Sequence, residues 1–286
     1  MTPLEVAPSG AEPRAHPKKS EMTTRLASAV VMAVLALGSV LVSVWTFVAL
    51  VIAAGVTVAW EWGRLVRKAG FDGIALIQAG SVAVVAVTIA VSRPGLAVIA
   101  TVVALAGTVL LGSSSATLGW SVLGIAYSVL PASAMVWLRA DPELGAMALL
   151  YLLVVAWTTD SASYAGGRLI GGPKLAPKIS PQKTWSGLIV GTLAPAVVGF
   201  AFAFFLKDTS SWRLAIVSVV IAAACQIGDL SESAVKRRFG AKDMSNLIPG
   251  HGGLLDRIDG LLIAAIAAAL IAMRDPGNPG RGLLIW

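Results

Sequence analysis

The sequence predicts an all-α polytopic membrane protein with about nine transmembrane helices and a polar site that faces the cytoplasm. Hydrophobic residues make up 57% of the 286 residues, and charged residues make up only 13%. Such a composition suits a chain whose solvent is the lipid bilayer. The apolar residues occur in runs of about 20, the length of a helix that crosses a bilayer. These runs leave no room for a separate soluble domain.

Residues 1–25 are predicted to be a disordered cytoplasmic tail. They hold prolines at positions 3, 8, 13 and 17 among charged and small residues, and they show no periodic apolar face. The apolar run that begins after Arg25 continues for 35 residues, whereas the apolar core of a cleaved signal peptide has about 7–15. We therefore expect this run to stay in the membrane and residues 26–286 to form one transmembrane domain.

The first apolar run, 26–60, is too long for one span and is predicted to form two short helices with a break near Ser43–Thr46. The remaining spans are expected at 74–91, 96–111, 117–138, 144–164, 186–206, 213–228 and 260–273.

The distribution of basic residues supports the hairpin and orients the bundle. With nine spans, 16 of the 22 Lys and Arg residues lie on one side, in the tail and in segments 61–72, 112–116, 165–185 and 229–259. The excess of basic residues predicts that this side is cytoplasmic. If 26–60 were a single helix, the split would fall to 12 against 10. Nine spans with the amino terminus inside are therefore favoured.

Two polar blocks, 160–187 and 226–259, concentrate charge at the cytoplasmic side. The first block holds four basic residues among Gly and Pro, and the second holds both signs of charge with Gly250, Gly252 and Gly253. Basic side chains and backbone N–H groups that glycine lets come close suit a polyphosphate. The alternative, that these basic residues only set the topology, stays open.

Acidic residues at the helix ends carry a stronger signal, because a carboxylate near hydrocarbon costs several kcal/mol unless it is paired or binds a cation. Asp229 precedes Glu232 by three residues, and Asp256 precedes Asp259 by three. Residues so spaced share a helix face, about 5–6 Å apart. Carboxylates beside polyphosphate, without a Cys/His cluster, favour Mg²⁺ over zinc.

Each of these features has a simpler alternative. Asp229, Asp256 and Asp259 suit ion pairs with nearby Lys and Arg, and an Asp at a helix start is favourable for dipole reasons. His251 suits a phosphate contact, a role as an acid, or a hydrogen bond to its own backbone. Glu61 follows Trp60 at an expected membrane interface, where an acid needs no special role.

The segment from Ser233 to Asp259 resembles the signature of the phosphatidate cytidylyltransferase family, also called CDP-diacylglycerol synthases. The matching positions are Ser233, Lys236-Arg237, Lys242-Asp243, Ser245, Pro249, His251-Gly252-Gly253, Asp256-Arg257 and Asp259. Segments 226–233 and 160–164, the latter running on to 178–187, resemble the family's other polar regions. Gln182 and Ser186 depart from the usual lysine and glutamate, so a charge role at these two positions is not expected here.

The resemblance implies conversion of CTP and phosphatidate to CDP-diacylglycerol and pyrophosphate, assisted by Mg²⁺ and leaving a second cation open. The expected catalytic domain is the whole of 26–286, with the two polar blocks forming the site. The expected metal ligands are Asp229, Asp256 and Asp160. The expected catalytic residues are Lys236, Arg237, Lys242, Asp243, Arg257 and Asp259. The expected substrate-binding residues are Ser180, Lys183, Thr184, Ser233, His251, Gly252, Gly253 and Tyr164.

The expected surroundings are the bilayer of a bacterial inner membrane, with no nucleic acid. Small residues in the spans permit a homodimer, although they serve packing within one chain equally well. A CDP-archaeol synthase or polyprenol kinase would use the same chemistry on another lipid. A transporter is disfavoured, because the acids and bases gather at one membrane face and the spans show no internal repeat.

Overall fold

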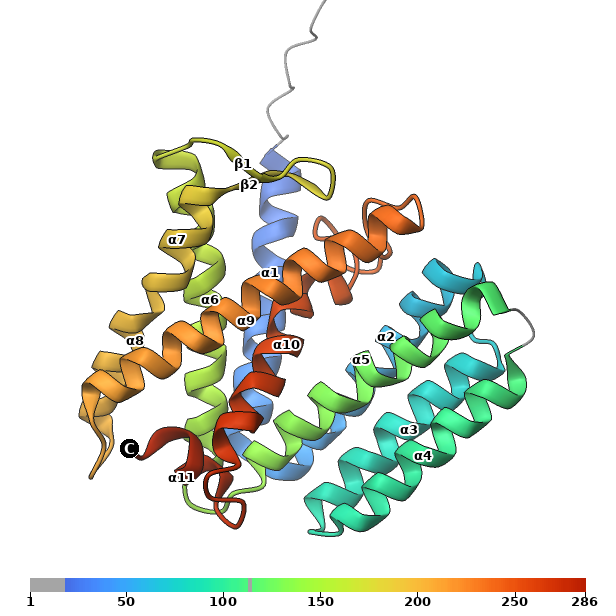
Figure 1. Cartoon of the computed structure of the whole chain (residues 1–286), viewed down its shortest axis with the longest axis horizontal. Coiled ribbons are helices and arrows are strands. Elements are labelled where there is room, and N and C mark those ends of the chain that lie inside the picture. The colour runs from blue at the N-terminus through green and yellow to red at the C-terminus, as the bar shows by residue number, and fades with distance from the viewer. Residues whose placement is uncertain (1–18, 113–114) are drawn as a thin grey trace, which may run out of the picture.

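The computed structural model describes residues 19–112 and 115–286, and this part of the chain is mostly helical (Figure 1). The elements are α1 (Lys19–Val42), α2 (Val44–Arg67), α3 (Gly73–Ala90), α4 (Pro94–Leu111), α5 (Ser115–Arg139), α6 (Gly145–Leu169), β1 (Lys174–Ala176), β2 (Ser180–Thr184), α7 (Trp185–Leu193), α8 (Pro195–Phe202), the 3₁₀ turn η1 (Ala203–Phe205), α9 (Ser211–Arg238), α10 (Leu255–Ala272) and α11 (Pro279–Leu284).

The chain is a polytopic helical membrane protein, as predicted. Within the described ranges, eight helical segments are long and apolar enough to cross a membrane, and α7, α8 and η1 together count as one of them. Helix α10 occupies the place of the ninth predicted span. It is not among the eight, because its first turns carry the charged residues Asp256, Arg257 and Asp259. Large apolar side chains such as Val103 and Leu110, 64% and 84% exposed, cover the outer surface. Such a surface suits contact with lipid.

The predicted break in the first apolar run is confirmed. Helix α1 ends at Val42 and α2 begins at Val44. Ser43 caps α2: its Oγ accepts the Thr46 N–H at 3.1 Å, and Thr46 Oγ1 accepts the Ser43 N–H at 3.0 Å. This reciprocal pair satisfies two backbone donors and starts a new helix one residue after the last one ends.

Several predicted boundaries were wrong, and two of them concern the polar segments. The tail was drawn too long, since 19–25 already belong to α1, whereas 1–18 lie outside the described residues. The loop 229–259 was also drawn too long, because α9 continues to Arg238. Hydropathy marks where a span leaves the lipid, not where its helix ends. The ion pair between Glu232 and Lys236, one turn apart, supports the polar extension of α9.

The 165–185 segment contains a small antiparallel hairpin that the sequence did not predict. Lys174 of β1 lies opposite Thr184 of β2, and Ala176 lies opposite Ser180. Thr184 then caps α7, because its Oγ1 accepts the Gly187 N–H at 3.1 Å. The hairpin thus ends directly in a membrane helix, and this fixes its position over the bundle.

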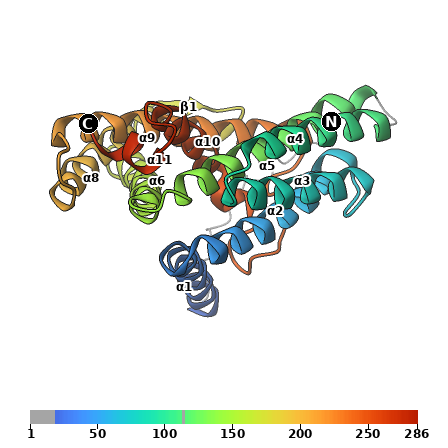
Figure 2. The same ribbon diagram turned by 90° about the horizontal axis from the view of Figure 1, so that it is seen from below.

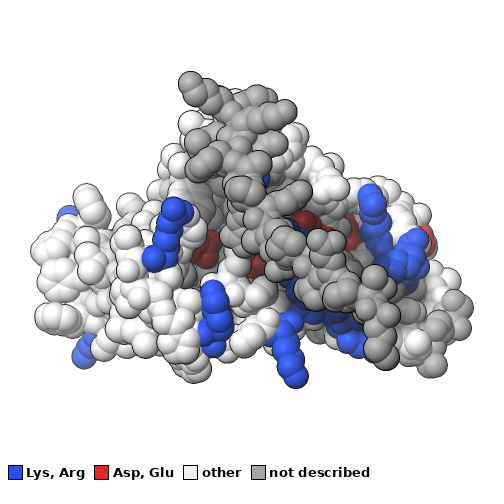
Figure 3. All heavy atoms as spheres, turned by 90° about the horizontal axis from the view of Figure 1, so that it is seen from above, with Lys and Arg blue, Asp and Glu red and all other residues white. Residues whose placement is uncertain are grey.

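One end of the bundle gathers the polar segments. The start of α1, the hairpin and the end of α9 all lie there, at the top of Figure 1. Figure 3 looks onto this end and shows blue Lys and Arg side chains on the rim with red acidic side chains set deeper between them. We call it the polar end. Figure 2 shows α1 lying on one side of the remaining helices. In its most apolar stretch of 18 residues, only 6% of the residues are buried.

Helices α9 and α10 cross with their backbones almost in contact. A Cβ atom on Gly228 would lie 2.6 Å from the Asp259 carbonyl oxygen, and one on Gly260 would lie 2.6 Å from Cys225 Sγ. Only glycine permits this approach. The crossing brings Asp229, next to Gly228, close to Asp259, next to Gly260. Two carboxylates that are 30 positions apart in the sequence therefore lie close together.

We predict that Gly260→Ala lowers the free energy of unfolding by about 1–3 kcal/mol, because the added methyl group overpacks the crossing. The midpoint of thermal unfolding in detergent measures this. The matched control is Gly80→Ala in α3, where no atom lies within 4 Å of the added Cβ. An unfolding midpoint of Gly260→Ala equal to that of Gly80→Ala would contradict the close crossing.

Candidate active site

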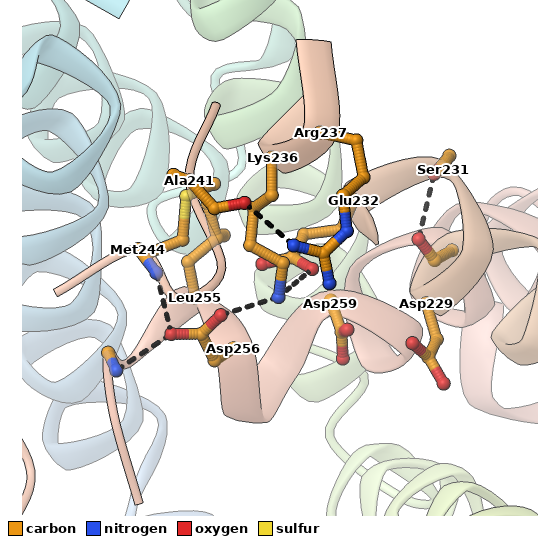
Figure 4. A network of polar contacts seen from close by, with 12 residues as sticks. Asp229, Ser231, Glu232, Lys236, Arg237, Ala241, Met244, Leu255, Asp256 and Asp259 are labelled. Atoms are coloured by element: carbon orange, nitrogen blue, oxygen red, sulfur yellow. Dashed lines mark hydrogen bonds and ion pairs between the residues drawn. The ribbon is translucent and has the colours of Figure 1, made fainter. Parts of the chain in front are cut away.

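A half-buried lysine between two buried carboxylates forms the centre of the polar end (Figure 4). Lys236 Nζ lies 2.6 Å from Glu232 Oε2 on its own helix and 2.6 Å from Asp256 Oδ1 on α10. The side chains of Glu232 and Asp256 are 0% and 2% exposed. One ammonium group thus ties α9 to α10. Its positive charge offsets part of the negative charge of the two buried carboxylates.

Asp256 also closes the loop between α9 and α10, residues 239–254, which we call the signature loop. Its Oδ2 accepts the Met244 N–H at 2.9 Å and the Gly253 N–H at 2.8 Å. Two backbone donors that lie nine residues apart in the loop therefore meet at one oxygen atom. The sequence left open a metal-ligand role and an ion pair for Asp256, and here it makes the ion pair with Lys236.

A second group of acids lies beside this centre. Asp160 of α6, Asp229 of α9 and Asp259 of α10 are close enough for their carboxylates to interact electrostatically. Figure 4 shows Asp229 and Asp259 pointing the same way from their two helices. Asp229 Oδ2 pairs with Lys183 Nζ at 2.7 Å, and this ion pair joins the two polar blocks.

This donor set can be tested for its fit to Mg²⁺. Within 19–112 and 115–286, no three Asp, Glu, His or Cys side chains are close enough to enclose a metal ion by themselves. Mg²⁺ does not require such an enclosure, since it combines one or two carboxylates with water and substrate phosphate oxygens. Carboxylates of Asp160, Asp229 and Asp259 meet this looser requirement without enclosing the ion, whereas the Asp256 oxygens already accept three donors.

The basic residues divide into tethered and open ones. Arg237 Nε donates to the Ile179 carbonyl and Arg237 Nη1 to the Ala241 carbonyl, each at 3.1 Å. Arg237 therefore holds the hairpin against the end of α9. Lys242 and Arg257 are exposed, so their ammonium and guanidinium groups are open to an anionic ligand.

The other predicted site residues fall into two groups. Asp243 is exposed in the signature loop, whereas Ser180, Ser233 and Gly252 are half-buried at the polar end. Gly253 is buried there. Thr184 is the cap of α7, and Tyr164 is 67% exposed and accepts a hydrogen bond from Arg168 Nη1 at 2.6 Å. The structure thus gives Thr184 and Tyr164 structural partners of their own.

An apolar cavity of about 570 Å³ opens beneath the acids. Side chains of α1, α2, α5, α6 and α10 line it, and most of them are apolar, such as Met32, Leu50 and Leu149. At one end the lining changes to Asp160, His251, Arg257 and Asp259. A cavity with apolar walls and a charged end suits an amphipathic ligand that has an anionic head.

Helix α1 touches the signature loop at this cavity. Ser28 Oγ lies 2.8 Å from His251 Nδ1, and it also reaches the Pro249 carbonyl at 3.3 Å. The loosely packed helix is thereby linked to the loop that the sequence singled out. The His251 imidazole thus has a side-chain partner on α1, while the His251 backbone N–H donates to the Ile248 carbonyl of its own loop at 3.0 Å.

Sequence reasoning missed Glu61 and Tyr127. The expectation that Glu61 needs no special role was wrong, because its buried carboxylate accepts three hydrogen bonds from the signature loop and α10. The sequence feature that could have identified Glu61 is an acidic residue at the end of a long apolar run. The Tyr127 ring stacks on Trp62, and its phenol lies within electrostatic reach of Asp259 and Glu232. An aromatic residue in an apolar helix carries no comparable signal.

The fold and the site together define a polytopic membrane protein whose acids and bases meet at one end of the bundle beside an apolar cavity. A model of the cytidylyltransferase family matches residues 23–273. The match covers most of the chain, so the protein belongs to the cytidylyltransferase family.

Curated relatives carry a more specific name. The phosphatidate cytidylyltransferase of Brucella suis biovar 1 is 47% identical over 134 residues, which are 47% of this chain and 50% of the relative. That of Haemophilus influenzae is 46% identical over 129 residues, 43% of this chain and 45% of the relative. That of Rickettsia bellii is 41% identical over 143 residues, 48% and 62%. The chain thus matches about half the length of most of these relatives.

We predict that Lys236→Met lowers the free energy of unfolding by about 3–5 kcal/mol, because it leaves two buried carboxylates without their shared cation. Thermal unfolding in detergent measures the loss. Lys178→Met, in the exposed turn of the hairpin, is the matched control and should unfold like the parent protein. Equal unfolding midpoints for the two variants would show that Glu232 and Asp256 do not depend on Lys236.

Proposed function

We propose that this protein is a phosphatidate cytidylyltransferase, which converts CTP and phosphatidate to CDP-diacylglycerol and pyrophosphate. The observation that carries the proposal is the junction of an apolar cavity with a cluster of acids and bases at its charged end. Membership of the cytidylyltransferase family and the names of the relatives support the same reaction.

The reaction needs little covalent chemistry from the protein. A phosphate oxygen of phosphatidate attacks the α-phosphorus of CTP, and the bond from that phosphorus to the oxygen bridging to the β-phosphate breaks. Pyrophosphate leaves with the bonding electrons. Because the lipid phosphate is already an anionic nucleophile, the enzyme has to bring two anions together in line and neutralise their charge.

Within this proposal, Asp160, Asp229 and Asp259 would hold Mg²⁺, and Asp256 would join them only by giving up one of its donors. Bound Mg²⁺ would supply positive charge to the phosphates. Lys183, which pairs with Asp229 in this structure, would instead bind a phosphate group of CTP once the nucleotide is present. Lys242 and Arg257 are the further cations open to phosphate groups. Ser180, Ser233, His251 and Gly252 lie near enough to the polar end to add donors.

The lipid would enter the cavity sideways from the bilayer. The apolar walls of the cavity, near Met32 and Leu50, would accept acyl chain segments, and the headgroup would reach the acids through Arg257 and His251. We propose that the polar end faces the cytoplasm of a bacterial cell, because the excess of Lys and Arg lies there and CTP and Mg²⁺ are cytoplasmic. The homodimer expected from the small residues remains a prediction.

The test is the release of pyrophosphate by the purified, detergent-solubilised protein in the presence of Mg²⁺. We expect release only when CTP and phosphatidate are both present, and no release when ATP replaces CTP. Removal of the divalent cation with a chelator should abolish the signal. A folded protein that releases no pyrophosphate under these conditions would contradict the proposal.

We predict that Asp256→Asn keeps the protein folded and inserted but lowers turnover at least about tenfold, which corresponds to about 1.4 kcal/mol of transition-state stabilisation. The amide removes the charge that holds Lys236 and presents an N–H group where the carboxylate accepted donors. The matched control is Gln182→Lys on the exposed surface of β2, which should keep its turnover. Normal turnover in Asp256→Asn would refute its role.

A further inference from the structure

We infer that Glu61 is a positioning residue, which fixes the signature loop and the first turn of α10 in the geometry that the transfer reaction needs. The inference rests on the proposed function. Glu61 lies on α2, outside both polar blocks, and none of the motifs in the second half of the chain includes it. Its contacts with those motifs are direct.

The Glu61 carboxylate is fully buried and accepts three hydrogen bonds. Its Oε1 accepts the Ser245 Oγ–H at 2.6 Å and the Leu254 N–H at 2.9 Å, and its Oε2 accepts the Leu255 N–H at 2.8 Å. The first N–H groups of a helix have no partner within the helix, and a negative charge beside them is favourable. Glu61 therefore does for α10 what a capping residue does, but from another helix.

The constraint extends into the signature loop. Ser245, held by Glu61, accepts the Leu247 N–H at 3.2 Å. Gly253 passes so close that a Cβ atom there would lie 2.5 Å from Glu61 Oε1. Asp256 holds Met244 and Gly253 from the other side. Two buried carboxylates, one from α2 and one from α10, thus hold both the middle of the loop and its junction with α10.

Helix α2 can serve as the fixed reference because its neighbours hold it in place. Trp62, the next residue, is buried, donates from Nε1 to the Trp120 carbonyl at 2.9 Å, and stacks on Tyr127 of α5 with ring centroids 5.3 Å apart. Arg257 and Asp259 follow the turn that Glu61 holds, and both line the cavity. A shift of this turn would move both groups relative to the substrate, and a displacement of about 1 Å can cost about 100-fold in rate.

The chain offers a matched control for a purely structural role. Asp141 is also a buried carboxylate that accepts three backbone N–H groups, from Glu143, Leu144 and Gly280, at 2.9, 2.8 and 2.9 Å. It joins the α5–α6 loop to α11, at the opposite end of the bundle from the signature loop. Asp141→Asn therefore disturbs the same kind of contact without touching the polar end.

The experiment compares Glu61→Gln, the milder Ser245→Ala and the control Asp141→Asn in steady-state kinetics with CTP and phosphatidate. Assays are run well below the unfolding midpoint of each variant. A spin label on Asn246→Cys, an exposed loop position, reports the motion of the signature loop without any need for activity. The native Cys225 is buried, and a sample labelled without the Asn246→Cys change measures its background.

We expect Glu61→Gln to lower kcat/KM for CTP at least about tenfold and to increase the mobility of the label, with Ser245→Ala intermediate in both. Asp141→Asn should lower the unfolding midpoint while kcat/KM and label mobility stay at the parental values. Parental kinetics and an immobile label in Glu61→Gln would overturn the inference. So would an equal loss of kcat/KM in Asp141→Asn, because general destabilisation would then suffice.

Failure of the proposed function gives a different result. If the parent protein shows no activity with CTP and phosphatidate, the reaction assignment fails while the spin label still reports on Glu61. A label that becomes mobile in Glu61→Gln and not in Asp141→Asn would then support its positioning of the loop. A label that stays immobile would refute it.

Discussion

A single ammonium group, that of Lys236, lies between two buried carboxylates where α9 meets α10. Each of these charges would be costly at this depth alone, and removing one partner of such a group costs about 3–5 kcal/mol. The ion pair to Asp256 holds the first turn of α10, and Asp256 in turn holds two backbone N–H groups of the signature loop, those of Met244 and Gly253. This contact therefore helps to fix the loop and the first turn of α10.

The glycines at the crossing of α9 and α10 make the contact possible. Gly228 and Gly260 let the two backbones touch, so that Asp229 and Asp259 lie together beside the Lys236 centre. Lys183 reaches Asp229 from the hairpin, and Arg237 ties the same hairpin to α9. Acids that repel one another are thus held close together, next to an apolar cavity.

Much of this arrangement could be predicted from the sequence, because hydropathy and charge act locally. The break at Ser43, the spans and the gathering of acids at one end all follow from apolar length and from the distribution of Lys and Arg. The partners of the acids could not be predicted, since they depend on how the helices cross. Asp256 pairs with Lys236, one of several nearby cations, and Glu61 binds loop residues 184 and 193 positions away. Tyr127 and the cavity depend on packing, which has no pattern of its own in the sequence.

The most direct test determines whether the α- or the γ-phosphate of CTP is transferred to the lipid. The protein is embedded in nanodiscs that contain phosphatidate and is given Mg²⁺ with CTP labelled with radioactive phosphorus at either the α or the γ position. Cytidylyl transfer predicts that α label enters the lipid fraction and that γ label leaves in pyrophosphate. Transfer of the γ label to lipid would identify a kinase instead, and the absence of either label from lipid would contradict transfer at this site.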